Sequence, residues 1–279
     1  MITDPRSYEG DVPSAYWVVI PAYNEAATVR DVVARTRRHC HNVIVVDDGS
    51  SDDTSAVLTG LDVTVLRNEE NLGKAGSLWR GFQHAMARGG VGVVTLDADG
   101  QHAPEEIPLL VAASFANRDA LVIGARRKDQ RKHSFWRYAA NRIADFWIGW
   151  AAGRSIEDTQ SGFRLYPLSF LRHLHVPHGK SRSFVFESEA LIEAGRTGIR
   201  ISTVGVGAAA RGGPSPSHFR PVLDIAKITV MVAGKLFMKG LYPSGLFRML
   251  YEGVSGGRSE GNIVGAKRPG PRQSTRERW

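Results

Sequence analysis

The sequence contains a single cysteine, Cys40, among 279 residues. One thiol cannot form an intramolecular disulfide, and it excludes a zinc site built from several cysteines. No stretch reaches the ~20 uninterrupted apolar residues of a membrane-spanning helix. The first residues, 1–6, lack the apolar segment of a secretory signal. These absences favour a reducing compartment, and we expect a cytoplasmic protein with at most a peripheral place on the cytoplasmic face of a membrane.

Two binding fingerprints are also missing. The turn after the first predicted strand reads Pro21-Ala-Tyr-Asn-Glu25, so no Gly-x-Gly-x-x-Gly sequence opens a helix there to bind a dinucleotide. No nucleic-acid recognition motif occurs, although the chain carries a formal net charge of +8. Such a charge favours an anionic partner, and we expect phosphorylated substrates or an anionic membrane surface rather than nucleic acid. A nucleotide-binding module without enzymatic activity is one alternative.

Short apolar runs alternate with segments of helical periodicity over most of the chain. The runs, each expected to form a strand, span 16–20, 42–46, 63–66, 91–96, 120–123 and 201–206. Helices are expected over 24–39, a segment ending at 87, a segment opened by 104–106, 135–151, 187–194 and 221–239. This alternation predicts an α/β domain with a mostly parallel sheet flanked by helices, and the 42% of hydrophobic residues is enough for its core.

The run 93–96 ends at two carboxylates, Asp97 and Asp99, which Gln101 follows. A buried parallel strand delivers such side chains to its C-terminal end, where open α/β sheets bind ligands. Two carboxylates and an amide oxygen suit a hard divalent cation, Mg²⁺ or Mn²⁺, that shares its ligands with substrate phosphates. The sequence therefore predicts a metal–diphosphate site; the alternative is a turn at Asp99 and a helix cap at Asp97.

Two other strand ends carry polar groups of related chemistry. Tyr23 and Glu25 follow the first predicted strand, and Asp47 and Asp48 follow the second. An aromatic ring can pack on a base or a ribose, and a carboxylate can accept hydrogen bonds from sugar hydroxyls or base N–H groups. The carboxyl ends of parallel strands meet at one edge of a sheet. The three strand ends together therefore predict a nucleoside pocket beside the metal.

Five motifs occur in one order along the chain. They are Pro-x-Tyr-Asn-Glu at 21–25, Asp-Asp-Gly-Ser-x-Asp-x-Thr at 47–54, Asn-x-Gly-Lys at 71–74, Asp-Ala-Asp-Gly-Gln-His at 97–102 and Asp-x-x-Ser-Gly-Phe-Arg at 158–164. This set, over about residues 16–220, resembles family 2 inverting glycosyltransferases of the GT-A fold. It is most similar to their dolichol/polyprenol-phosphate mannosyl- and glucosyltransferase branch. The resemblance implies inverting, metal-dependent transfer of a hexose from a GDP-mannose or UDP-glucose type of donor to a polyprenyl phosphate.

The resemblance also implies roles for single residues. The donor would be bound by Pro21, Tyr23, Glu25, Asp47, Asp48, Lys74 and Asp97. The Mg²⁺ or Mn²⁺ ion would be held by Asp97, Asp99 and Gln101, of which Asp99 is also a catalytic candidate. Arg211 is similar to the late arginine that the branch places on the donor phosphates, but Ser217-His218 stands where the branch has Ser-Lys. Glu187 and Glu189 are similar to the branch's Phe-Asp-x-Glu segment, and we interpret them as structural or as supporting the site rather than as catalytic.

The acceptor decides which further groups are needed. A lipid monophosphate is already an anion and needs positioning and charge neutralisation rather than a general base. The resemblance makes Arg126 and Arg137 the candidates for binding it, with Ser161 on the same side. A hydroxyl acceptor, on a glycan, a glycolipid or a small molecule, would instead need a carboxylate base, for which Asp158 is the catalytic candidate. The sequence leaves both acceptors open.

The C-terminal part of the chain has a different character. A predicted helix over 221–239 is apolar on a wide face and carries Lys227, Lys235 and Lys239. Such a helix can lie on anionic lipid, or it can pack on the sheet, and both alternatives stay open. The expected organisation is a flexible arm (1–15), the GT-A domain (16–220), an amphipathic segment that can lie at a membrane interface (221–252) and a disordered basic tail (253–279).

Overall fold

The computed structural model describes residues 12–116, 119–126, 135–180, 185–207 and 221–259. The strands are β1 (Tyr16–Ala22), β2 (Val43–Asp47), β3 (Thr64–Arg67), β4 (Gly92–Thr95), β5 (Leu121–Arg126), β6 (Arg164–Pro167) and β7 (Ile201–Val206). The helices are α1 (Val29–Arg37), α2 (Gly73–Ala87), α3 (Ile107–Ala116), α4 (Phe135–Ala152), α5 (Leu168–Arg172), α6 (Val185–Arg196), α7 (Pro221–Phe237) and α8 (Pro243–Ser259). Two short 3₁₀ helices are η2 (Ala56–Leu58) and η3 (Pro104–Glu106).

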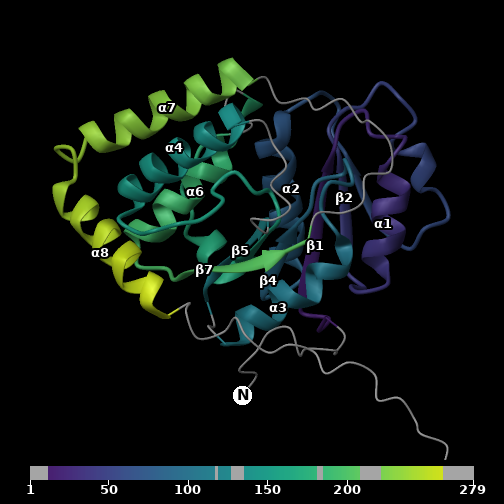
Figure 1. The fold of residues 1–279 in the computed structure, drawn as a ribbon. Helices are drawn as coiled ribbons and strands as arrows, with labels where there is room; N and C mark the ends of the chain where they lie inside the picture. Colours follow the sequence, from purple (N-terminus) through teal and green to yellow (C-terminus); the bar gives the residue numbers. More distant parts are fainter. Residues whose placement is uncertain (1–11, 117–118, 127–134, 181–184, 208–220, 260–279) are drawn as a thin grey trace, which may run out of the picture.

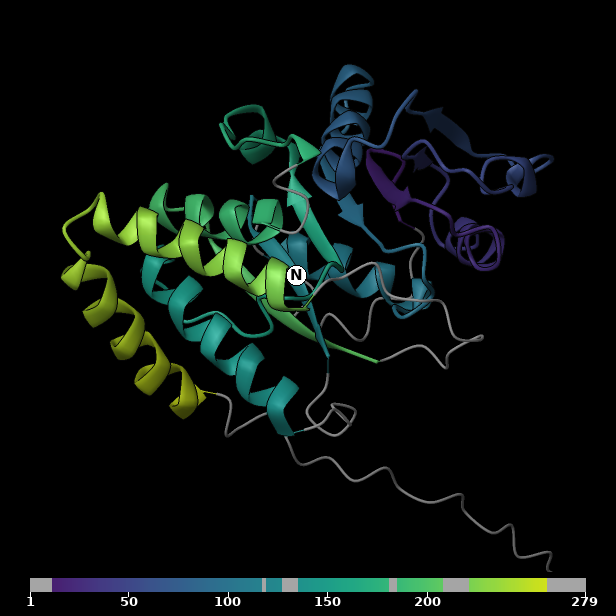
Figure 2. The same cartoon turned by 90° about the horizontal axis from the view of Figure 1, so that it is seen from above.

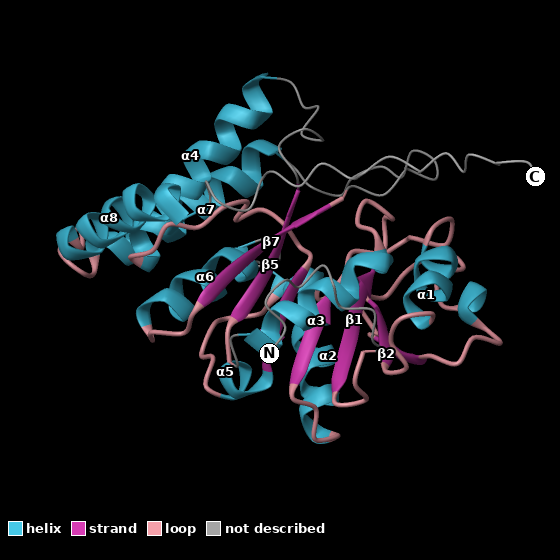
Figure 3. Cartoon of the chain, turned by 60° about the horizontal axis from the view of Figure 1, so that its bottom comes forward, coloured by secondary structure: helices cyan, strands magenta, loops and turns pink. Residues whose placement is uncertain are grey.

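The strands form one sheet in the order β3-β2-β1-β4-β6-β5-β7 (Figures 1 and 3). All neighbouring pairs in it are parallel except those that involve β6, which runs antiparallel to β4 and to β5. The predicted mostly parallel sheet flanked by helices is confirmed.

Both faces of the sheet are covered by helices. On β1, Trp17 and Val19 belong to one buried cluster, whereas Val18 and Ile20 belong to the other. The first cluster includes residues of α2, α4, α6 and α7, and the second includes residues of α1 and α3. A strand that is buried on both sides needs apolar residues at every position, which explains the continuous apolar runs in the sequence.

The register brings six segments to one edge of the sheet. Ala22 at the end of β1 pairs with Asp47 at the end of β2, and Val19 pairs with Thr95 at the end of β4. The antiparallel β6 starts at this edge, because its first residue, Arg164, also pairs with Thr95. Loops that follow β1, β2, β4 and β5 therefore meet the loop that precedes β6, and β7 ends beside β5.

Several elements differ from the sequence-based expectation. Strand β6 and helix α5 were not predicted, and α1 begins at Val29 rather than at residue 24. Asn24 has a positive φ of 55°, which a helix cannot contain. The predicted disorder from 253 is wrong for the first part of the tail, because α8 continues to Ser259. Residues 1–11 of the predicted arm and 260–279 of the predicted tail lie outside the described residues.

Helices α4, α6, α7 and α8 form a layer beside the sheet (Figures 1 and 2). Arg196 of α6 donates hydrogen bonds to the carbonyl oxygens of Ala151 in α4 and Lys235 in α7, at 3.0 Å each. None of the helices described is both long and apolar enough to cross a bilayer. The hydrogen bonds of Arg196 show that α6 joins α4 to α7. Helices α7 and α8 lie on the side of the layer that faces away from the sheet (Figures 1 and 2).

Gly195 of α6 packs directly against the backbone of α4. A Cβ atom there would lie 2.5 Å from the carbonyl oxygen of Ala152, a backbone atom that cannot move aside alone. We expect Gly195→Ala to lower the free energy of unfolding by about 2 kcal/mol through overpacking. Gly234→Ala is the matched control, since a Cβ there meets nothing within 4 Å and alanine favours a helix by about 1 kcal/mol. Urea denaturation of both variants tests the opposite signs.

Candidate active site

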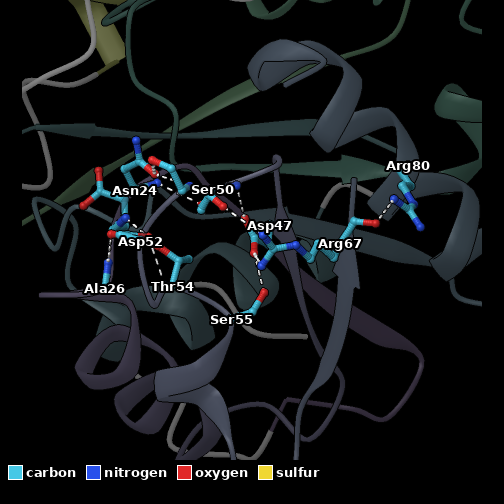
Figure 4. A network of polar contacts seen from close by, with 11 residues as sticks. Asn24, Ala26, Asp47, Ser50, Asp52, Thr54, Ser55, Arg67 and Arg80 are labelled. Carbon is cyan, nitrogen blue, oxygen red and sulfur yellow. Dashed lines mark hydrogen bonds and ion pairs between the residues drawn. The ribbon is translucent and has the colours of Figure 1, made fainter. Parts of the chain in front are cut away.

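The loops after β1 and β2 are joined by their motif residues (Figure 4). The Asn24 N–H donates to Ser50 Oγ at 3.0 Å, and the Asn24 side-chain oxygen accepts from the Ser51 N–H at 2.9 Å. Asp52 accepts from the Ala26 N–H at 3.1 Å. These bonds support the positive φ of Asn24, which costs energy in a residue with a side chain. The first two motifs thus act as one rigid unit at the sheet edge.

Asp47 and Asp48 are both buried. Asp47 Oδ2 pairs with Arg67 at 3.0 Å. Asp48 accepts hydrogen bonds from the backbone N–H groups of Leu72 and Gly73, each at 2.8 Å. These two N–H groups stand at the N-terminus of α2. N–H groups there have no hydrogen-bond partner within the helix and favour a nearby negative charge. In this structure Asp48 therefore anchors the start of the helix that carries Lys74, and its contact with a nucleoside stays a prediction.

Lys74 lies between two carboxylates at the centre of the edge. Its Nζ is 2.7 Å from Asp97 Oδ1 and 3.2 Å from Glu187 Oε2. Burial acts to raise the pKa of Asp97, but the charge and hydrogen bond of Lys74, together with the nearby His102 and Arg164, lower it overall. Burial likewise acts to lower the pKa of Lys74, but Asp97 and Glu187 outweigh it and raise that pKa. Lys74 and Asp97 therefore both favour their charged forms. The sequence predicted Lys74 and Asp97 at this site and missed the part played by Glu187.

Gly162 presses directly on this charged group. A Cβ atom on Gly162 would lie 2.6 Å from Asp97 Oδ2 and 3.0 Å from Lys74 Nζ. The hydroxyl of Thr95 in β4 donates to the Gly162 carbonyl at 2.7 Å, which fixes the glycine against the end of the strand. The close approach explains why glycine stands here, and the sequence alone did not reveal it.

Asp158 and Arg126 form one ion pair. The Arg126 guanidinium donates to both Asp158 oxygens, at 2.9 Å and 3.2 Å, and the Arg126 backbone N–H donates at 2.9 Å. Asp158 is 4% exposed and has a positive φ of 51°. The sequence had assigned these residues to opposite alternatives, one to a phosphate acceptor and the other to a hydroxyl acceptor. The structure places both in the same contact at the ends of β5 and the loop before β6.

Buried polar side chains hold this loop from behind. Arg164 is fully buried and donates to the carbonyl oxygens of Thr159, Ser161 and Glu187 at 2.6–2.8 Å. Asp145 of α4 accepts from the Thr159 N–H and hydroxyl at 2.8 and 2.7 Å. The sequence missed Asp145, for which a single acid in an otherwise apolar helical stretch was the only signal. Arg164 was seen only as the end of a motif.

The remaining predicted residues have different outcomes. Ser161 is buried and donates its hydroxyl to the Gly124 carbonyl at 2.6 Å, so here it supports the loop. Glu25 is buried and accepts from the Thr28 hydroxyl at 2.9 Å, while Pro21 and Tyr23 are partly exposed at the end of β1. Arg137 lies in the first turn of α4, but its side chain is not among those described, and Arg211 lies outside the described residues.

Comparison with known protein families matches residues 17–188 to Glycosyl transferase family 2. The chain belongs to this family. A UDP-N-acetylglucosamine–dolichyl-phosphate N-acetylglucosaminyltransferase of Methanococcus voltae is 29% identical over 209 residues, 67% of this chain and 83% of that protein. An undecaprenyl-phosphate 4-deoxy-4-formamido-L-arabinose transferase of Sodalis glossinidius is 35% identical over 161 residues, 53% of this chain. This glycosyltransferase spans only 48% of the Sodalis protein.

A solved structure shows the same fold. Glucosyl-3-phosphoglycerate synthase from Mycobacterium tuberculosis, in complex with Mn²⁺, UDP-glucose and phosphoglyceric acid, matches with a TM-score of 0.60 and 25% identity. The match covers 80% of this chain and 78% of that one. The same synthase is also crystallised with Mg²⁺ and UDP. The GT-A fold and the glycosyltransferase activity expected from the sequence are confirmed for this chain.

The acids after β4 fit a divalent cation. Asp99 accepts from Gln101 at 3.0 Å through the backbone N–H and at 2.6 Å through the side-chain amide. Burial, and next the charge of Asp97, raise the pKa of Asp99 to about 6. A bound cation would offset the repulsion between these two carboxylates. Within the described part of the chain, no group of three or more His, Cys, Asp and Glu side chains could hold a metal ion. Two carboxylates with substrate phosphates suffice for Mg²⁺.

Proposed function

We propose that this glycosyltransferase transfers a sugar from a nucleotide diphosphate sugar to a polyprenyl phosphate, with inversion. The names of the Methanococcus and Sodalis relatives, which contain dolichyl phosphate and undecaprenyl phosphate, support this acceptor. The observation that carries the proposal is the pair of Arg126 and Asp158. Both oxygens of the one candidate base already accept hydrogen bonds from Arg126, and taking a proton would disrupt them. A phosphate acceptor needs no base.

The site then works through position and charge. A phosphate oxygen of the acceptor attacks the anomeric carbon, the bond to the donor diphosphate breaks, and nucleoside diphosphate leaves. In this proposal Lys74, which pairs with Asp97, would offset the negative charge on that leaving group, and Arg126, which pairs with Asp158, would bind the acceptor phosphate. Preorganised cations of this kind stabilise a transition state more than a flexible solvent does. Mg²⁺ or Mn²⁺ held by Asp97, Asp99 and Gln101 would act as a Lewis acid on the diphosphate.

A donor screen tests the reaction directly. We infer a hexose donor of the UDP-glucose or GDP-mannose type, and the UDP in the names of the Methanococcus relative and the Mycobacterium structures supports the first. UDP-, GDP- and dTDP-sugars would be incubated with Mn²⁺, with and without a short polyprenyl phosphate. We expect consumption of one donor to rise steeply with the lipid phosphate. Absence of that rise for every donor would contradict the proposed acceptor.

A hydroxyl acceptor is the second candidate. The Mycobacterium synthase is crystallised with phosphoglyceric acid, a small acceptor-like molecule that carries a hydroxyl group. Asp158 would then have to act as the base. Donor consumption that depends on a hydroxyl compound and ignores the lipid phosphate would favour this candidate over the first.

Arg126 and Asp158 separate the two candidates by kinetics. For a phosphate acceptor we expect Arg126→Gln to raise the acceptor KM about tenfold, because a charged hydrogen bond is lost, with little change in the donor KM. Asp158→Asn keeps the shape and should lower kcat only a few-fold. A loss of kcat of about a thousandfold in Asp158→Asn, with the acceptor KM unchanged in Arg126→Gln, would instead indicate a base and a hydroxyl acceptor.

The same proposal places the enzyme at a membrane. A polyprenyl chain stays in a bilayer, so the domain must reach the lipid phosphate from the membrane surface. The net charge of +8 supports contact with anionic lipid. We propose a peripheral position on the cytoplasmic face and no nucleic-acid partner, with the GT-A domain over 16–220 and the amphipathic segment after it extended to the end of α8 at Ser259.

A further inference from the structure

Large apolar side chains are exposed along α7 and α8. Phe237 is 81% exposed, Met238 77% and Tyr251 76%. We define the outer face as these exposed residues: Val230, Phe237, Met238, Leu241, Phe247, Leu250, Tyr251 and Val254. On α8, Phe247, Leu250, Tyr251 and Val254 recur at three and four residues and make one stripe. On α7, Val230 and Phe237 are seven residues apart and share a face, and Met238 and Leu241 lie in the turn between the two helices. Figures 1 and 2 show both helices on the outer side of the helical layer.

The opposite side of α7 is also apolar. Ile228, Met231, Val232 and Leu236 of α7 are buried in the core cluster shared with α4 and α6. A helix that is apolar on both sides is one that is covered on both sides. The sheet side is covered by the protein itself, so the outer face calls for a further partner.

The charges on α7 and α8 are sorted by sign. Lys235 turns inward to Glu189 and Glu193, at 3.0 and 2.7 Å, and Glu252 pairs with Arg154 at 3.5 Å. The charged side chains described as exposed between 227 and 254 are all basic: Lys227, Lys239 and Arg248. Basic residues among exposed aromatic and aliphatic ones match a surface with negative headgroups over an apolar layer.

We propose that the outer face of α7 and α8 docks on an anionic lipid bilayer, with its apolar side chains in the headgroup boundary. The proposal rests on the lipid-borne acceptor proposed above and assigns the residues that bring the site to it. Trp147 of α4 is also exposed and stacks on Trp150 at 5.2 Å, and Trp150 donates to the Tyr242 carbonyl in the turn between α7 and α8 at 3.2 Å. Such rings suit a membrane interface. A second copy of the chain is the competing occupant, but a dimer contact would set the exposed cations against each other.

Vesicle sedimentation without donor or acceptor tests the docking. The probes are vesicles of phosphatidylcholine alone and of phosphatidylcholine mixed with phosphatidylglycerol. We expect binding to the mixed vesicles only, weakened by salt, and a loss of about tenfold or more in the double variant Phe237→Ser/Tyr251→Ser. The matched control is Val65→Ser/Val91→Ser, which removes exposed apolar residues of β3 and of the loop before β4, outside α7 and α8, and should bind as the wild type does.

The outcomes separate the docking from the proposed function. Wild-type protein that binds vesicles but ignores a short, soluble polyprenyl phosphate keeps the docking and removes the acceptor. Protein that uses the soluble acceptor but does not bind mixed vesicles removes the docking alone. A dimer in sedimentation velocity that the double variant dissociates, without vesicle binding, would assign the outer face to a second copy.

A separate observation concerns Glu187. Its Oε2 contacts Lys74 at 3.2 Å, while its Oε1 is buried and has no hydrogen-bond partner among the described residues. Lys74 is closer to Asp97, at 2.7 Å, and so occupies an oxygen that a divalent cation would need. We infer that Lys74 moves from Asp97 to Glu187 when the cation binds, which makes Glu187 a positioning residue. The inference rests on the proposed use of a metal.

Calorimetric titration with Mn²⁺ tests this exchange in the wild type, two single variants, their double variant and a control. We expect Glu187→Gln to weaken Mn²⁺ binding about fivefold or more, because Lys74 then has only Asp97 to pair with. Lys74→Met should strengthen binding, and adding Glu187→Gln to it should change nothing further. Glu193→Gln, which removes the same charge from the same helix, is the control. Equal weakening by Glu187→Gln in both backgrounds would overturn the exchange, and a wild type that binds no Mn²⁺ would remove the metal as well.

Discussion

Replacing Asp97 by asparagine is expected to lower kcat of sugar transfer by about a thousandfold or more. The variant keeps the size of the side chain but removes the charge that pairs with Lys74 at 2.7 Å and that would hold the cation on the diphosphate. Stabilisation of a departing diphosphate by a metal amounts to several kcal/mol. Initial rates with the donor found in the screen, at saturating Mn²⁺ and acceptor, measure the effect.

The fold should survive this substitution. Lys74 keeps Glu187 as its second carboxylate, so no buried cation is left alone. Asp31→Asn is the control, because Asp31 is an exposed acid of α1 in an i,i+4 pair with Arg35 and such pairs contribute little. An Asp97→Asn enzyme with more than a tenth of the wild-type kcat, in metal-replete buffer, would contradict the metal site.

Adding one methyl group at Gly162 is expected to reduce kcat/KM by about a hundredfold or more. The new Cβ would lie 2.6 Å from Asp97 Oδ2 and 3.0 Å from Lys74 Nζ, so the carboxylate must shift. A displacement of about 1 Å in a positioned group is enough for such a loss. The expected signature is weaker Mn²⁺ binding in calorimetry together with lower turnover.

A second glycine provides the comparison. Gly179 has nothing within 4 Å of a built Cβ and no positive φ, so Gly179→Ala should keep both activity and Mn²⁺ binding. Thermal melts of the two variants show whether Gly162→Ala acts on the site or on the whole domain. Normal Mn²⁺ affinity in a folded Gly162→Ala protein would mean that Asp97 can move aside without consequence.

The strands that carry the acids could be predicted because their sequence signals are local. Apolar runs that stop at Asp47, Asp97 and the Pro21–Glu25 turn predicted parallel strands, and the structure has them within one or two residues. Strand β6 could not be predicted in the same way. It has only four residues, Arg164–Pro167, and starts with a buried arginine, so neither its length nor its pattern indicates a strand.

The C-terminal helices show the same limit. The expected helix over 221–239 corresponds to α7, but the end of order was placed at Gly253 from composition, whereas α8 extends to Ser259. The helix is stabilised by tertiary contacts, among them the pair of Arg154 and Glu252. Composition indicates whether a segment forms a helix in isolation. In a folded protein, tertiary contacts can stabilise a helix that its composition alone does not favour.

What the sequence determined by itself was the class of fold and the edge of the sheet where the motif residues gather, Asp97 and Asp99 among them. Those conclusions depend on residues close together in the chain. Only the tertiary structure decided which groups pair: Arg126 with Asp158, Lys74 with Glu187, and Gly162 against Asp97. Each of these contacts joins residues more than 30 positions apart. The periodicity of a sequence indicates only local structure. These contacts between distant residues arise from the register of the sheet and from the antiparallel direction of β6.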